Sequence, residues 1–159
     1  MKFFLPEDYQ PKLNLIFENE KVSIQKILPH ARIEHICASS IPHAVSKGDL
    51  DIFVGVDSSG FNDAISSIKS IGYFEQKDTF RSEILCMLKK EDRTDDIAKQ
   101  LVANGSEFEV FVSFRDLMIN HPEYVHAYNE LKTSCSGMNE DDYRKIKSEF
   151  IQKLLNEKA

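Results

Sequence analysis

Two aspartates one residue apart in an apolar segment are the part of this sequence best suited to chemistry. Asp49 and Asp51 lie in KGDLDIFVGV, residues 47–56. In a strand such residues share one face with Cα atoms about 6.6 Å apart, so both carboxylates can point to one place. At an effective dielectric near 20, two bare charges at that distance repel by roughly 2–3 kcal/mol. A divalent cation, Mg²⁺ or Mn²⁺, would offset this cost. The alternative is a solvated strand end that needs no partner.

The spacing of apolar residues predicts the elements that hold this pair. In order they are a helix over 11–29, strands over 31–38 and 49–56, a helix over 61–72, strands over 80–90 and 96–114, and helices over 114–132 and 139–155. Asn104-Gly105 lies between two apolar segments and predicts a hairpin turn within 96–114. Asn139 is a plausible N-cap for the last helix.

The chain length and composition favour one compact domain. The 159 residues are 42% hydrophobic and 29% charged, and they contain no low-complexity tract. We therefore expect an α+β fold over residues 1–159, with a mixed sheet flanked by helices and a helical tail, residues 113–159, packed on it.

The charge balance restricts the partners. Twenty basic and 26 acidic residues give a net charge of −6, which disfavours duplex nucleic acid but leaves room for a small phosphate ligand held through a metal ion. Three widely separated cysteines indicate reduced thiols, and no apolar run is long enough to span a membrane. A cytoplasmic protein is expected, and its oligomeric state is open.

Two segments of the sequence resemble the GrpB family of the nucleotidyltransferase superfamily. The first is IEHICASSIPHAVSKGDLDIFV, residues 33–54, which contains the aspartate pair. The second is FRDLMINHPEYVHAYNELK, residues 114–132, with its FRD, HPE and LK positions. The closing DDYRKIKSEFIQ also matches the family's spacing. The similarity extends over residues 6–155.

The resemblance implies a nucleotidyltransferase-like fold with an Asp-x-Asp pair for metal and a third carboxylate on a later strand. Asp49 and Asp51 correspond to the pair. Glu109, in the predicted strand, is chosen as the third carboxylate, and Glu107 is the alternative. Glu109 could instead be an exposed strand residue without a role in metal binding. In catalytic members of the superfamily, two metal ions activate an acceptor hydroxyl and stabilise the leaving pyrophosphate. The expected substrates are a nucleoside triphosphate and an unknown hydroxyl acceptor.

The resemblance also indicates residues that contact phosphate. Ser39, Ser40 and Lys47 lie in the expected phosphate loop, and Arg81 could reach the same ligand. Arg115, in FRD, is interpreted as structural.

Two departures from the family's pattern affect this loop. In this sequence Cys37-Ala38 replaces the Gly-Ser pair that is usual in the family, and His43 replaces a glycine that is usual there. A second hypothesis is therefore a non-catalytic module that binds a nucleotide or a protein through the same fold.

Other interpretations of the loop are weaker. His30, His35 and His43 lie near one another but lack a compact zinc spacing. Cys37 has no neighbouring residue to orient a catalytic base, so a small, partly buried thiol is the better interpretation.

Overall fold

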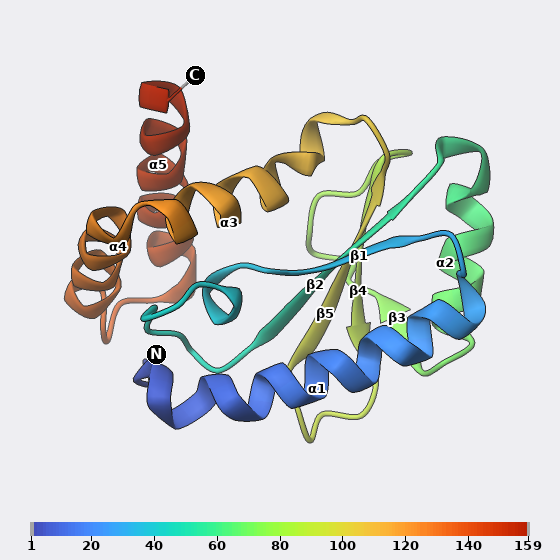
Figure 1. The fold of residues 1–159 in the computed structure, drawn as a ribbon, viewed down its shortest axis with the longest axis horizontal. Helices are drawn as coiled ribbons and strands as arrows, with labels where there is room; N and C mark the ends of the chain where they lie inside the picture. The colour runs from blue at the N-terminus through green and yellow to red at the C-terminus, as the bar shows by residue number, and fades with distance from the viewer. Residues whose placement is uncertain (1, 159) are drawn as a thin grey trace.

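The structure is a computed structural model that describes residues 2–158, and its centre is a five-stranded mixed sheet (Figure 1). The strands are β1 (Arg32–Ile36), β2 (Leu50–Val56), β3 (Tyr73–Glu75), β4 (Leu85–Lys90) and β5 (Ile97–Ala103). Their order across the sheet is β1-β2-β5-β4-β3. The central pair β2 and β5 is parallel, and every other neighbouring pair is antiparallel.

Two helices cover one face of the sheet. The alternate residues of β2 that face α1 (Pro6–Ile27) and α2 (Phe61–Lys69) join their apolar side chains in the largest core cluster. Leu50, Ile52 and Val54 are fully buried in it, as their alternation predicts. Although α1 has 22 residues, it has a polar side, and no helix within residues 2–158 is long and apolar enough to cross a membrane.

The other three helices follow β5. They are α3 (Val110–Asn120), α4 (Pro122–Ser134) and α5 (Glu140–Lys158). The first turns of α3 cover the opposite face of the sheet through Val112, which clusters with Phe53 and Val102. Figure 1 shows α4 and α5 gathered at the end of the sheet where β1 ends and β2 begins. The aspartate pair lies at that same end.

The predicted hairpin at Asn104-Gly105 is wrong. Strand β5 ends at Ala103, and after a 3₁₀ turn, Glu107–Glu109, the chain enters α3. The sheet order explains the difference, because β5 already pairs with β2 on one side and β4 on the other. Strand β5 therefore has no free edge on which a strand after residue 105 could pair as a hairpin. The apolar residues of 108–114 instead pack as a helix.

Several predicted elements are confirmed with shifted bounds. Helix α1 runs from Pro6 to Ile27, whereas the prediction was 11–29. The short strand β3 follows Gly72 and was not predicted. Asn139 caps α5 as expected, since its Oδ1 accepts a hydrogen bond from the Asp142 backbone N–H at 2.9 Å.

A buried ion pair fixes α1 to the sheet. Lys99 of β5 is fully buried, and its Nζ donates to Glu20 Oε1 of α1 at 2.9 Å. The Tyr73 hydroxyl donates to the same carboxylate, and the Lys99 ammonium lies 3.3 Å from the Tyr73 ring centroid. A charge in this position requires such partners, because burial without them costs several kcal/mol. The cluster lies on the sheet face opposite the aspartate pair.

Candidate functional site

The two aspartates lie together at the start of β2. Asp51 pairs in register with Ile36 of β1, and Asp49 immediately precedes the strand. Both line one small cavity. Burial raises the pKa of Asp51 well above its usual range, and the neighbouring Asp49 raises it further. The pair therefore resists carrying two negative charges, which is the condition under which a bound cation stabilises carboxylates.

Three lysines from distant segments line the same cavity. They are Lys47 from the loop before β2, Lys132 from α4 and Lys147 from α5. The cavity has a volume of about 50 Å³. A water molecule takes about 30 Å³ of liquid, so this space suits a cation or a phosphate oxygen but not a whole nucleotide. The cavity thus combines hard oxygen ligands with positive charge.

Lys132 is almost completely buried beside the pair. It is 1% exposed, and its Nζ donates to the Val45 carbonyl at 2.7 Å. Burial lowers the pKa of Lys132 to about 7, and repulsion from Lys147 acts in the same direction against the attraction of Asp49. An anion in the cavity would favour the charged form.

Lys147 stays charged at neutral pH. The neighbouring Tyr128 raises the pKa of Lys147 above its ordinary value against the effect of burial, and Cys37 and Asp51 contribute in the same direction. Its side chain extends from α5 to the wall between the aspartates and the helical end of the molecule. Lys147 thus faces the aspartate cavity on one side and a second cavity, between the helices, on the other.

The loop between β1 and β2 has a strained backbone at two positions. Cys37 has φ 63° and ψ −167°, and His43 has φ 69°. The first conformation is essentially restricted to glycine, and the second is uncommon for other residues. These are the positions at which the sequence departs from glycine in the family's pattern. The backbone thus keeps a glycine-like path while carrying two side chains.

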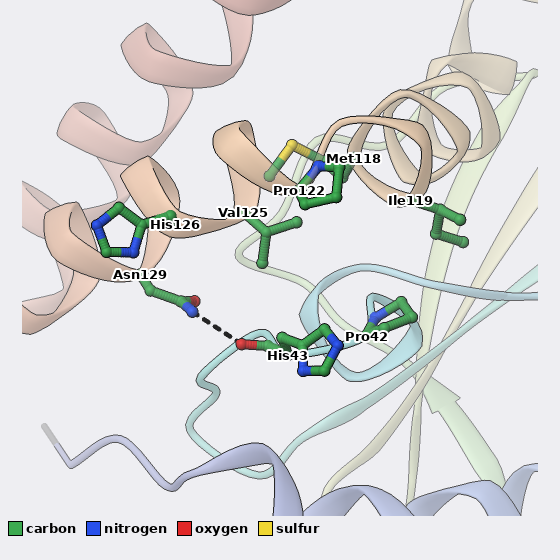
Figure 2. Close-up of a pocket in the computed structure, with 8 residues that line it drawn as sticks. All are labelled: Pro42, His43, Met118, Ile119, Pro122, Val125, His126 and Asn129. Carbon is green, nitrogen blue, oxygen red and sulfur yellow. Dashed lines mark hydrogen bonds between the residues drawn. The ribbon is translucent and has the colours of Figure 1, made fainter.

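Side chains from two helices hold this loop. Tyr9 of α1 donates its hydroxyl to the Ala44 carbonyl at 2.7 Å. Asn129 of α4 donates Nδ2 to the His43 carbonyl at 2.8 Å, and its Oδ1 accepts from the Val45 N–H at 2.9 Å. Figure 2 shows the Asn129–His43 bond at the edge of a cavity of about 240 Å³ between the loop and α3–α4. That cavity contains neither aspartate.

The two loop serines have intramolecular partners. Ser39 is buried, and its Oγ lies 2.8 Å from His35 Nε2. Ser40 Oγ donates to the Cys37 carbonyl at 2.6 Å. Lys47, in contrast, reaches the aspartate cavity and lies 3.5 Å from Glu140 Oε1. Of the three predicted loop contacts, Lys47 alone lines the cavity within residues 2–158.

Glu109 does not join the pair. It lies in the 3₁₀ turn after β5, and its Oε1 accepts from the Gly105 N–H at 2.8 Å. Because β5 runs parallel to β2, β5 ends about 16 Å along the strands from the level of Asp51, and this turn follows that far end. Glu107 lies in the same turn. The prediction that Glu109 is a mid-strand residue is wrong, because the strand ends six residues earlier.

The register shows what occupies the place of a third carboxylate. Asp51 lies beside Ala98 of β5, and Ala98 lies beside Lys89 of β4. Lys89 pairs with Asp96, which immediately precedes β5. Among residues 2–158, no three His, Cys, Asp or Glu side chains are grouped to hold a metal ion. The residues present fit one cation on two carboxylates and do not fit a second.

Arg81 is also distant from the pair. Its Nε donates to Glu75 Oε1 at 2.9 Å, and Glu75 lies on the edge strand β3, which β4 and β5 separate from β2. Arg115 is structural, as interpreted, since its Nη1 donates to Glu34 Oε1 at 2.8 Å and to the His35 carbonyl at 3.0 Å.

Comparison with known proteins decides the family. The family model described as GrpB protein matches residues 7–157. The chain belongs to the GrpB family. A UPF0157 protein of Vibrio cholerae is 46% identical over 99% of this chain and 83% of its own length. One from Deinococcus radiodurans is 27% identical over 90% of this chain and 76% of its own length.

Solved structures show the same fold. The GrpB crystal structure from Enterococcus faecalis matches with a TM-score of 0.73 and 21% identity, over 97% of this chain and 99% of that one. The Cid1 poly(U) polymerase, in a MgGTP-bound crystal structure, matches with a TM-score of 0.53 and 11% identity. That match covers 77% of this chain and 39% of the polymerase. The GrpB fold of this chain is thus nucleotidyltransferase-like.

Sequence reasoning missed three residues of this GrpB site. Asn129 and Lys132 lie within residues 114–132, whose similarity to the family could have indicated them. Lys147 lies in the closing segment that matches the family's spacing. The sequence assigned these three residues only to helices. Helical periodicity alone does not show which polar residue of a helix faces a distant loop.

Proposed function

We propose that this protein binds a nucleoside triphosphate together with a divalent cation at the Asp49–Asp51 cavity and transfers the nucleoside monophosphate to a hydroxyl. The observation that carries the proposal is the convergence of two carboxylates and three lysines on one small cavity. The fold shared with nucleotidyltransferases supports the reaction class.

The residues of the cavity would divide the work by charge. A divalent cation, when bound, would neutralise carboxylate charge and bring phosphate oxygens to it. Lys47, Lys132 and Lys147 would hold phosphate oxygens by charge-assisted hydrogen bonds. In the transfer, the acceptor oxygen forms a bond to the α-phosphorus, the bond to the β-phosphate oxygen breaks, pyrophosphate leaves with the electron pair, and the hydroxyl proton passes to water.

A specific observation favours a second candidate, a nucleotide-binding module without catalysis. Ala98 occupies the register position beside Asp51 on β5, and Lys89 lies beside Ala98 on β4, so within residues 2–158 no third carboxylate stands at this register to activate an acceptor. The side chain of Cys37 also occupies a position at which glycine would allow a phosphate closer to the backbone.

Thermal unfolding with Mg²⁺ or Mn²⁺ and each of the four nucleoside triphosphates tests the binding. Stabilisation should require metal and nucleotide together, and it reaches about 2.7 kcal/mol at a hundredfold excess over Kd. Asp49→Asn and Asp51→Asn should abolish the dependence on metal, and Lys132→Met should weaken nucleotide binding. Lys145→Met, on an exposed part of α5, is the matched control. Absence of stabilisation in the wild type would reject both candidates.

An α-labelled triphosphate separates the two candidates. Label transferred to a metabolite mixture, and lost in Asp51→Asn, supports the transferase. Binding without transfer supports the module.

A further inference from the structure

A larger cavity adjoins the aspartate cavity on its helical side. It has a volume of about 310 Å³ and lies between α3, α4 and α5. Its apolar lining consists of Val110, Phe111, Phe114, Tyr128, Ile151 and Leu155. This volume is at the small end of the range for ligand pockets, about 300–1,000 Å³.

The two cavities share a wall. Cys37 and Lys147 line both of them. A molecule in the larger cavity would therefore meet, at one end, the Lys147 ammonium and the thiol that separates it from Asp51. The rest of the lining consists mostly of apolar side chains of α3 and α5, with Ser148 and Gln152 of α5 beside them. The two ends of the larger cavity therefore differ in polarity, which favours an amphipathic ligand.

We propose that this cavity binds the apolar body of the acceptor, an aryl or alkyl alcohol, and presents its hydroxyl at Lys147. The inference rests on the proposed function, since it assigns the second substrate of the same site. An ammonium donates hydrogen bonds and has no acceptor, so a hydroxyl oxygen is a suitable partner for Lys147. Burying an aryl or alkyl group against the apolar side chains stabilises the complex in proportion to the apolar area removed from water.

A nucleobase fits this lining less well. Its edge carries several donors and acceptors, and each one buried against apolar side chains without a partner loses the hydrogen bond that it makes with water. The base of a triphosphate held in the aspartate cavity is therefore expected to lie outside the larger cavity, and the alcohol and the nucleotide should bind together.

The test titrates the whole protein with 2-phenylethanol in the absence of metal and nucleotide. Binding is detected by the chemical shifts of the backbone amides. We expect shifts at α3 and α5 around Val110 and Ile151. Val110→Trp and Ile151→Trp place an indole in the cavity and should each raise the Kd at least tenfold. Lys145→Trp, on an exposed turn of α5, should leave the Kd unchanged.

A second comparison examines the polar end of the cavity. The wild type should bind 2-phenylethanol more tightly than ethylbenzene, and Lys147→Met should remove that preference while keeping the apolar contact. Equal affinity for the two compounds in the wild type would overturn the assignment of the hydroxyl to Lys147.

Three results would overturn the proposal as a whole. The first is that 2-phenylethanol shifts no amide at the cavity. The second is that both tryptophan variants bind it with the wild-type Kd. The third is that uridine or adenosine displaces it. Failure of triphosphate binding would reject the proposed function while leaving the alcohol measurement unaffected, so the two failures are distinguishable.

Discussion

His35 illustrates how a single polar residue supports the loop next to the aspartates. Its ring stacks on Phe17 of α1 with centroids 4.9 Å apart, and Nε2 lies 2.8 Å from Ser39 Oγ. Burial, together with the charge of the Arg115 guanidinium, lowers the pKa of His35 to about 4. The neutral ring is thus part of the folded state, and its role is to position the loop rather than to bind a metal.

His35 should lower the stability of the folded state in acid, while the raised pKa of Asp51 acts in the opposite direction, so the effect of His35 is measured as a difference between variants. The unfolded state takes up the His35 proton near pH 6.5 and the folded state only near pH 4. Above pH 6.5 the neutral His35 ring does not reduce the free energy of unfolding. As pH falls through this window, the effect of His35 lowers that free energy by at most about 3 kcal/mol. Urea unfolding across the window measures it.

His35→Gln is the variant for this measurement, since glutamine can bond Ser39 without titrating. It should show a shallower loss of unfolding free energy, whereas His30→Gln, at an exposed position, should follow the wild type. An unchanged slope in His35→Gln would contradict the assignment.

At the scale of elements, the loop from β1 to β2 depends on helices distant in sequence. Tyr9 and Asn129 bond its carbonyls from α1 and α4, and Lys132 bonds Val45 beside them. Because Cys37 and His43 have strained backbones, the loop would not keep this path without such partners. Helix α4 therefore has a direct part in the geometry of the site.

Asn129→Ala tests this dependence. It removes the partners of the Val45 N–H and the His43 carbonyl, and the expected loss of unfolding free energy is about 1–3 kcal/mol. His126→Ala, three residues earlier at an exposed position of the same helix, should cost much less. Chemical denaturation of both variants makes the comparison, and equal losses would show that Asn129 does not hold the loop.

At the scale of the whole molecule, the candidate site lies between the sheet and the helical end. The carboxylates come from β2, while Lys132 and Lys147 come from α4 and α5. We propose that residues 113–159 fold together with the sheet as one domain. A site assembled from both parts requires this, since Asp49 and Asp51 lie in one part and Lys132 and Lys147 in the other.

Amide hydrogen exchange tests the single-domain proposal. The slowest amides of β2 and of α4 should exchange with the same free energy, equal to that of global unfolding, because both open only in the global transition. A clearly lower value for α4 would mean that the helical end unfolds separately.

The sequence by itself determined the strand that carries Asp49 and Asp51, most of the helices, and the family motifs around the pair. These depend on local periodicity and local residue order, which a single chain displays directly. The family match and the shared fold confirm that part of the prediction.

Only the tertiary structure decided which other residues accompany the pair. The sequence predicted a hairpin within residues 96–114 with its turn at Asn104-Gly105 and chose Glu109 from the second strand. The pairing of β5 on both sides instead left the residues after the turn to form a helix, with Ala98 beside Asp51. It also brought Lys132 and Lys147, more than 80 residues from the aspartates, to the same cavity. Such convergence depends on how elements pack, and periodicity within one element carries no information about it.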